Sequence, residues 1–378
     1  MKTPRIQSID ALRGLVMIVM ALDHIRDFFH YDSALHDPTN LQDTSPLLFF
    51  TRWITHFCAP TFILLTGLSA YLYGLKHTKK ELSRFLLTRG LWLILLEVTV
   101  VAFGWFFTLR IHNPILMVIW AIGISMVFLA LMVRLPYWTV VVTGALLVGF
   151  HNLSDGMQFP PGTFMNGLWT LLHVQGRIVF SPDFALFCFY PVLPYFGLIC
   201  LGFGLGKLFG PEVAASTRKK TLLFSGVSAI VLFALLRSLN SFGDPGHWAS
   251  QDTPLYTLLS FVNCNKYPVS LLFALMTLGP ALVFLSISEG VQNGVTRILV
   301  TIGKVPMFYY ILHIYLIHTL ALLTEEPNPN SFMHITPHFH LRSVYLIWIG
   351  IVAALYFPCK WYGTYKAAHP EKKWLSYL

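Results

Sequence analysis

Hydrophobic runs long enough to cross a bilayer recur from one end of the chain to the other. A bilayer core of ~30 Å needs about 20 mostly apolar residues per helix. The runs, separated by polar connections, predict about ten membrane-spanning helices, at 10–31, 46–75, 82–109, 113–133, 136–152, 184–208, 217–240, 266–288, 297–323 and 342–366. The pattern therefore predicts an all-α, polytopic membrane helix bundle that forms one domain over residues 1–378.

Composition excludes an ordinary soluble protein. Of the 378 residues, 55% are hydrophobic and 11% are charged, whereas a soluble domain carries roughly 25% charged residues. The formal net charge of +9 would suggest a nucleic-acid partner in a soluble protein. In a membrane protein it is expected from basic residues that set orientation, so lipid is the expected partner and nucleic acid is not.

Basic residues sort between the two sides of the predicted bundle. With the N-terminus in the cytoplasm, nineteen of the 26 lysines and arginines fall on the inner side, and the outer side keeps Arg26, Arg52, Arg110, Arg177, Arg237, Lys266 and Arg342. This bias predicts both termini in the cytoplasm, and the multi-pass chain is expected in the cell inner (plasma) membrane. Histidine shows the opposite distribution, since only His77 and His369 of the 15 lie on inner loops.

The first predicted helix carries ionisable residues at both ends. Its inner end reads Ser8-Ile9-Asp10-Ala11-Leu12-Arg13-Gly14, and its outer end reads Asp23-His24-Ile25-Arg26-Asp27. Such residues in a spanning helix usually face a cavity or a partner. Arg13 and His24 are eleven residues apart, which is about three turns and ~16 Å along a helix. We therefore expect one helix face to carry a cation near the cytoplasm and an imidazole toward the outside.

Three segments together resemble a known family. They are the Ser-x-Asp-x-x-Arg-Gly opening with its Arg-x10-His spacing, Pro60-Thr61-Phe62-Ile63-Leu64-Leu65-Thr66-Gly67, and Gly303-Lys304-Val305-Pro306-Met307-Phe308-Tyr309-Tyr310-Ile311-Leu312-His313. They look like the heparan-alpha-glucosaminide N-acetyltransferase catalytic-domain family. The Arg-x10-His feature is also similar to the wider group of membrane acyltransferase-3 proteins.

The resemblance implies an N- or O-acyltransferase that works across the membrane. Acetyl-CoA, the co-substrate, would bind from the cytoplasm, and its acetyl group would pass to an amine or hydroxyl of an extracytoplasmic sugar, glycan or small amine. The resemblance also suggests a homodimer. Direct attack of the acceptor requires fewer assumptions than a covalent acetyl-histidine, and the sequence leaves both mechanisms open.

Histidine is the side chain whose unperturbed pKa suits a general base near neutral pH. His24 is the first candidate, with Asp23 or Asp27 orienting it or binding a cationic acceptor; Asp27, at i+3, lies on the same helix face. In lysosomal members of the resembled family, a loop histidine about a dozen residues further on is important, and asparagine stands where His24 does. His36 is the nearest match to that loop histidine, with His30 as a competitor.

Arg13 and Lys304 are candidates for binding the CoA phosphates, because guanidinium and ammonium groups both suit phosphate. An Asp10–Arg13 pair would equally serve to satisfy the inner helix end, and Lys304 would equally serve as an interfacial anchor. No metal site is expected from His313, His318, His334, His338 and His340. A proton-coupled small-molecule transporter is the alternative function, since buried Asp, His and Arg also build proton relays.

Overall fold

The computed structural model describes residues 6–33, 35–108, 112–328, 331, 333, 335–372 and 374–375. Most of them are helical, and short turns of other helix types follow α4, α7 and α9 at Glu97–Val101, His151–Ser154 and Gly206–Phe209. The helices are α1 (Gln7–Phe29), α2 (Pro46–Thr55), α3 (Cys58–Gly74), α4 (Lys79–Leu96), α5 (Ala102–Phe106), α6 (Val118–Met132), α7 (Tyr137–Phe150), α8 (Phe164–Leu172), α9 (Val192–Leu205), α10 (Ala215–Leu239), α11 (Pro254–Val262), α12 (Leu271–Ser288), α13 (Gly294–Gly303), α14 (Pro306–Thr324) and α15 (Leu341–Ala368).

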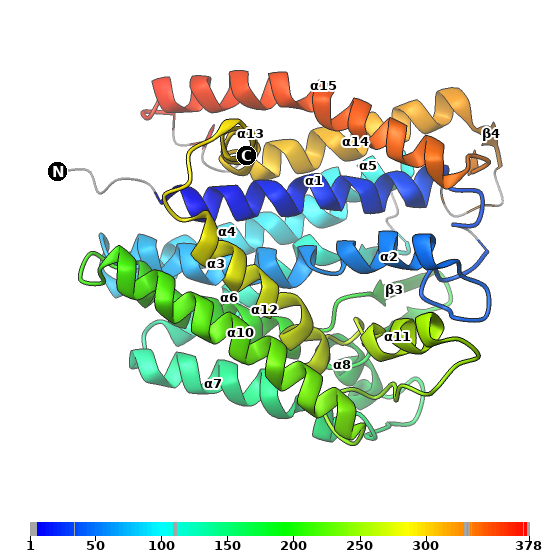
Figure 1. Ribbon diagram of the computed structural model, residues 1–378, viewed down its shortest axis with the longest axis horizontal. Coiled ribbons are helices and arrows are strands. Elements are labelled where there is room, and N and C mark those ends of the chain that lie inside the picture. The colour runs from blue at the N-terminus through cyan, green and yellow to red at the C-terminus, as the bar shows by residue number, and fades with distance from the viewer. Residues whose placement is uncertain are drawn as a thin grey trace.

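The helices form the expected polytopic bundle (Figure 1). Within the described residues, seven helical segments are long and apolar enough to cross a membrane: Pro46–Gly74, Lys79–Phe106, Val192–Phe209, Ala215–Leu239, Leu271–Ser288, Pro306–Thr324 and Leu341–Ala368. Figure 1 shows α1, α6 and α7 within the same bundle. The prediction of about ten spans therefore includes three helices outside those seven: α1, which carries six ionisable residues along its length, and the shorter α6 and α7.

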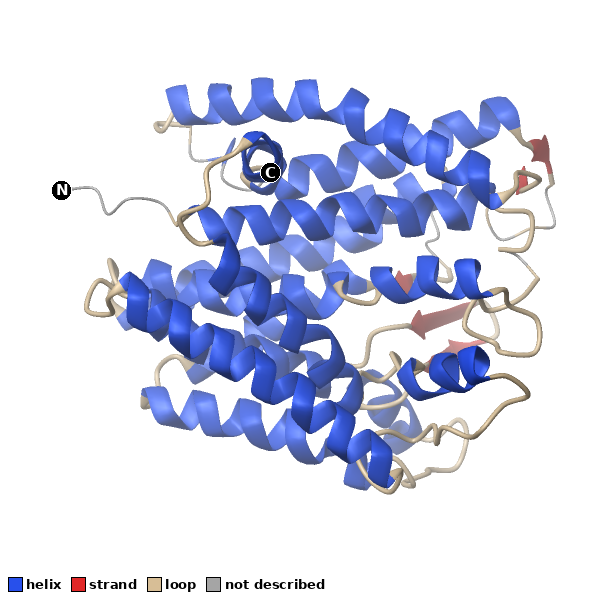
Figure 2. Cartoon of the chain, in the orientation of Figure 1, coloured by secondary structure: helices blue, strands red, loops and turns tan. Residues whose placement is uncertain are grey.

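The two ends of the bundle differ in structure. One end, called the proximal end below, holds the beginning of α1 and the end of α15, so both described ends of the chain lie there (Figure 1). The opposite, distal end holds the short helices α8 and α11 and two small sheets (Figure 2). The first sheet has the order β1-β3-β2, and the second pairs β4 with β5; their strands are Ile115–Leu116, Gly176–Ser181, Phe184–Cys188, Glu326–Pro327 and Ile335–Thr336 for β1 to β5.

The predicted spans 297–323 and 184–208 were wrong in part. The first is two helices, because Pro306 has no backbone N–H to continue α13 and disfavours the helical conformation of Val305 before it. Figure 2 shows α13 almost end-on beside helices that run across the view, so α13 crosses the bundle. In the second span, residues 184–188 form β3, and α9 begins only after Pro191.

Helix α1 lies at the centre of the packing. A Cβ atom built on Gly14 would lie 1.9 Å from the carbonyl oxygen of Leu299, and one built on Gly303 would lie 1.8 Å from that of Asp10. Only glycine at both positions allows α1 and α13 to cross at this distance. On another side of α1, the indole N–H of Trp348 in α15 donates to the carbonyl of Ile18 at 2.8 Å. The helix that carries the candidate chemistry is therefore fixed against several neighbours.

Candidate active site

A cavity of about 360 Å³ follows one face of α1. Arg13, Met17 and Met20 all line it, and their spacing of four and then three residues keeps them on one helix face. His24 is the next residue on that stripe. Tyr310 of α14 also lines the cavity, and its ring centroid is 6.3 Å from that of His24. The predicted common face of Arg13 and His24 is thus a cavity wall that leads from the proximal end toward the imidazole.

Cationic side chains gather on the proximal part of this wall. Arg13, Arg89 and Lys366 come from three different helices and line the same cavity. A second cavity of about 710 Å³ shares Arg13 and Ser69 with the first. It opens toward Asp10, Lys76 and Arg218. Arg13 therefore borders two neighbouring cavities at the proximal end.

Hydrogen bonds hold Arg13 in this position. Its Nη1 donates to Oδ1 of Asp10 at 3.1 Å and to the carbonyl of Gly303 at 3.3 Å, and its Nη2 donates to Oγ of Ser69 at 3.1 Å. The expected Asp10–Arg13 pair is present. It does not remove Arg13 from the cavities, because the guanidinium still lines both of them.

The structure does not bring Lys304 to this position. Its side chain is exposed just after α13, and among the described lining residues it borders neither of the two cavities. Lys366 and Arg89 take the place expected for it. The sequence gave no reason to choose them, since their approach to Arg13 depends on how α15 and α4 pack beside α1.

His24 forms a pair with His313 of α14. Nδ1 of His24 lies 2.7 Å from Nε2 of His313. The His24 ring also packs edge-on against Trp105, with 4.8 Å between ring centroids. His313 is fully buried, and its own Nδ1 lies 3.1 Å from the carbonyl oxygen of Tyr309 one turn earlier.

This network assigns the protons on both rings. A carbonyl oxygen only accepts, so Nδ1 of His313 carries a hydrogen and, in the neutral ring, Nε2 is an acceptor. Nδ1 of His24 must then be the donor in the contact between the rings. Nε2 of His24 is left with its lone pair, and within the described part of the chain it has no hydrogen-bond partner. The pair thus presents an unprotonated ring nitrogen, which is what a general base requires.

Asp23 and Asp27 are occupied by arginines. Nη1 of Arg52 donates to both carboxylate oxygens of Asp23, at 2.8 and 2.6 Å, and Oγ1 of Thr55 donates to one of them at 2.8 Å. Arg26 makes ion pairs with Asp23 at 2.8 Å and with Asp27 at 2.5 Å. Neither carboxylate forms a hydrogen bond with His24 among the described contacts, so the orienting partner is His313 and not an aspartate.

His36 lies away from this pair, in the loop after α1. Its side chain is 45% exposed, and Nδ1 lies 2.7 Å from Oδ1 of Asp32. This hydrogen bond raises the pKa of the His36 imidazole above its usual value. Asp32 and the competitor His30 line a separate distal hollow of about 450 Å³. His24 and His36 are therefore separate features of the site, one inside the bundle and one at its distal surface.

His313 is the site residue that sequence reasoning missed. It is the last residue of the third segment that resembles the family, and its place in that segment is the sequence feature that could have identified it. What the sequence could not supply is the pairing across two helices 289 residues apart.

The chain is a multi-pass membrane helix bundle with a cation-lined cavity at its proximal end and a histidine pair between α1 and α14. The chain belongs to the family described as heparan-alpha-glucosaminide N-acetyltransferase, catalytic, whose model matches residues 5–238. This membership supports acetyltransferase activity in a membrane protein. The matched region includes Arg13 and His24 and ends within α10, so His313 lies beyond it. No curated protein matches the chain.

Proposed function

We propose that the protein transfers the acetyl group of acetyl-CoA, bound from the cytoplasmic side, to an amine or hydroxyl of an extracytoplasmic sugar, glycan or small amine. The observation that carries the proposal is the stripe of Arg13, Met17 and Met20 along a cavity that leads to His24. In this arrangement the proximal end faces the cytoplasm, as the distribution of basic residues predicts, and the bundle spans the cell inner (plasma) membrane.

The two proximal cavities fit the two chemical parts of acetyl-CoA. The phosphates need cations, which Arg13, Lys76 and Arg218 supply around the larger cavity. The pantetheine arm and the acetyl group are narrower and less charged, and the smaller cavity offers mostly apolar walls such as Met17, Met20 and the ring of Tyr310. The thioester would then lie beside His24 while the nucleotide stays near the cytoplasm.

Nε2 of His24 serves as the general base in direct transfer. The acceptor nitrogen or oxygen attacks the thioester carbonyl carbon and gives its proton to Nε2. The carbon–sulfur bond then breaks, and the leaving CoA thiolate takes up the proton from Nε2 of His24, which gives free CoA and restores the base. Atoms and charge balance, because the acceptor loses one proton and gains the acetyl group, while CoA gains one proton.

His313 acts as a positioning residue. It accepts the hydrogen on Nδ1 of His24, which keeps Nε2 as the basic nitrogen and fixes the orientation of the ring. When His24 becomes an imidazolium, the same contact stabilises the added charge, since a hydrogen bond from a charged donor is about twice as strong as a neutral one.

The acceptor would approach from the distal end. The hollow beside the end of α1 contains the carboxylates of Asp32 and Asp43, which favour a cationic amine or the hydroxyls of a sugar. His36, through its hydrogen bond to Asp32, borders the same region. We therefore assign His36 to the acceptor side, where its replacement would change acceptor recognition more than the chemical step.

Titration of acetyl-CoA into the purified protein in detergent tests the proposal. Free CoA and a nucleotide without the pantetheine arm are the controls, and the variant Arg13→Ala is titrated beside the wild type. Saturable binding of acetyl-CoA and CoA that weakens in Arg13→Ala supports the assignment. Absence of binding across the millimolar range overturns it and favours the transporter, which would need no CoA site.

A further inference from the structure

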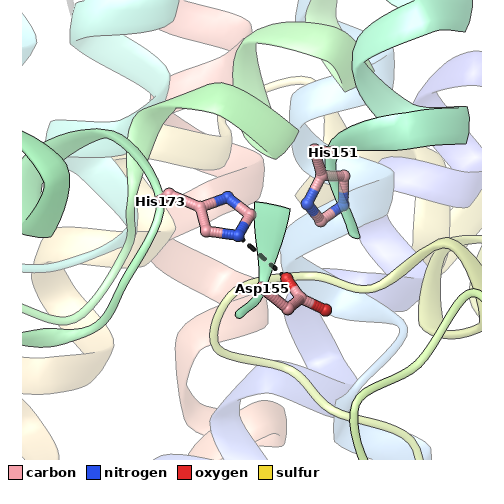
Figure 3. A group of neighbouring side chains, drawn as sticks. All are labelled: His151, Asp155 and His173. Carbon is pink, nitrogen blue, oxygen red and sulfur yellow. Dashed lines mark hydrogen bonds and ion pairs between the residues drawn. The ribbon is translucent and has the colours of Figure 1, made fainter. Parts of the chain in front are cut away.

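A second histidine cluster lies outside the candidate active site, at the distal end. His151 follows α7, Asp155 comes four residues later, and His173 follows α8 (Figure 3). One ligand atom of each side chain lies within 4.8 Å of those of the other two. Figure 3 shows the His173 ring joined to the Asp155 carboxylate by a hydrogen bond and the His151 ring beside them. The three groups therefore converge on one small volume.

The cluster is buried and its hydrogen bonding is incomplete. His173 is 1% exposed and His151 is 6% exposed. Nε2 of His173 lies 2.8 Å from Oδ1 of Asp155. Both ring nitrogens of His151, and Nδ1 of His173, are buried without a hydrogen bond of ordinary geometry. His151 does have a polar contact to the backbone of Val269, and the two nitrogens of one imidazole point apart. Buried polar atoms are nearly always satisfied, so unsatisfied nitrogens in two adjacent rings that converge on Asp155 indicate that a partner belongs there.

The structure assigns this cluster as a site for a divalent transition-metal ion, and we propose that Zn²⁺ is the ion it binds. Two imidazole nitrogens and one carboxylate oxygen are a donor set that zinc uses, whereas Mg²⁺ and Ca²⁺ prefer all-oxygen surroundings. Zinc ligands lie at about 2.0–2.2 Å from the metal. Small rotations of the side chains from a separation of at most 4.8 Å bring the three atoms to that distance.

Neighbouring groups already orient the ligands. The second carboxylate oxygen of Asp155 accepts a hydrogen bond from the Asn152 amide at 2.8 Å. The Asn152 carbonyl oxygen accepts from the backbone N–H of Leu271, the first residue of α12, at 2.9 Å. Partners of this kind fix ligand direction around bound metals. A metal here would therefore connect the ends of α7 and α8 to the start of α12.

The position of the cluster points to a structural role for the bound metal. The cluster contains none of the residues that line the two proximal cavities, and its three ligands come from the connecting segments that cover the distal end. Bound zinc would hold these segments together, with water completing the four ligands. The inference is independent of the proposed acetyl transfer.

Metal binding to the intact protein in detergent tests the proposal, using protein without a polyhistidine tag that has been stripped with a chelator. The wild type is titrated with Zn²⁺ by calorimetry and with Co²⁺ by visible absorption, beside Asp155→Asn and His151→Gln. His247→Gln is the matched control, because His247 is an exposed histidine in another distal loop. Mg²⁺ serves as the control ion.

The expected result is one Zn²⁺ per chain, visible bands of tetrahedral Co²⁺, and a higher melting temperature with Zn²⁺ than with Mg²⁺. Asp155→Asn and His151→Gln should each weaken binding at least about a hundredfold, and His247→Gln should change it less than twofold. If the variants do not fold, the Co²⁺ spectrum of the wild type decides alone. No saturable 1:1 binding, or equal losses in His247→Gln and Asp155→Asn, would overturn the assignment and leave water as the partner.

Discussion

The protein contains two buried histidine pairs that differ in how their nitrogens are satisfied. In His24 and His313 the rings bond directly to each other, and a backbone carbonyl sets the direction of the protons. In His151 and His173 the rings pack edge to face with 5.4 Å between centroids, and the Asp155 carboxylate forms a hydrogen bond with His173. The first arrangement leaves Nε2 of His24 without a hydrogen-bond partner in the described part of the chain, and the second brings one ligand atom from each of two imidazoles and a carboxylate together.

Under the two proposals, this difference separates a proton-transfer site from a cation site, although both sites use histidine. A relay needs a fixed tautomer, which a chain of single hydrogen bonds provides. A metal needs several lone pairs at once together with a negative charge, which two imidazoles and a carboxylate provide. The following predictions test whether the two histidine pairs have different functions.

Replacement of His24 by alanine should have the largest effect. Loss of a general base costs roughly 10²–10⁴-fold in rate, so kcat for acetyl transfer should fall by that factor while acetyl-CoA binding persists. Turnover of the purified variant, compared with its calorimetric affinity for acetyl-CoA, measures both. Full turnover in a folded His24→Ala protein would remove His24 from the mechanism.

Replacement of His313 by two different residues tests its proposed role as the positioning residue for His24. Its exchange for leucine leaves Nδ1–H of His24 buried without an acceptor, which costs about 1–3 kcal/mol and thus lowers kcat roughly 5- to 150-fold. His313→Gln keeps an acceptor oxygen and should recover part of the loss. The kcat of the two variants, with the pH profile of each, is the measurement. Equal losses in both, with unchanged pH profiles, would mean that His313 only fills space.

Arg13 tests the cation-lined end of the same cavity. Arg13→Ala removes a charged contact to phosphate worth about 1.5–3 kcal/mol, so KM for acetyl-CoA should rise about tenfold or more while kcat changes little. Lys304→Ala is the matched control, because its exposed ammonium borders neither cavity. Steady-state kinetics at varied acetyl-CoA concentration measure kcat and KM for both variants. Equal effects of the two changes would show that Arg13 has only a structural role.

Stabilisation by Zn²⁺ should depend on the His151–His173 pair and be independent of the His24–His313 pair. Zn²⁺ at a hundredfold excess over Kd stabilises a binding protein by about 2.7 kcal/mol, and this gain should persist in His313→Leu and disappear in Asp155→Asn. Melting curves of the three proteins with and without Zn²⁺ provide the comparison. If the zinc effect vanished in His313→Leu as well, the metal would bind at the active-site pair and the distinction between the pairs would fail.

The sequence predicted most of the bundle and the common helix face of Arg13 and His24 in the candidate site. Hydrophobic runs of about 20 residues identify spanning helices because the bilayer fixes their length, and helical spacing alone put Arg13 and His24 on one face. The strands of the distal end escaped prediction, because β3 lies within an apolar run that also suits a buried helix.

The partners of the predicted residues could not be read from the sequence. His313, Arg89 and Lys366 reach the site from distant helices, and their approach depends on packing at positions such as Gly14 and Gly303. Asp27 shows the opposite case, in which the sequence spacing favoured a contact that is not among the described ones. Its i+3 spacing favours contact with His24, but the neighbouring Arg26 is a charged partner and takes the carboxylate.

His36 gives the smallest expected effect and separates the two candidate histidines. Because its side chain is exposed and bonded to Asp32, His36→Ala should lower kcat less than about twofold, well below the effect expected for a general base.

The hydrogen bond to Asp32 raises the pKa of His36 in the folded protein. The stabilisation it gives is therefore complete below the unfolded pKa of ~6.5 and is lost as pH rises through the higher folded value. The melting temperatures of wild type and variant should differ more at about pH 5.5 than at about pH 9, on either side of that value. A loss of turnover as large as that of His24→Ala would instead move the base to the distal loop, and the buried pair would then be structural.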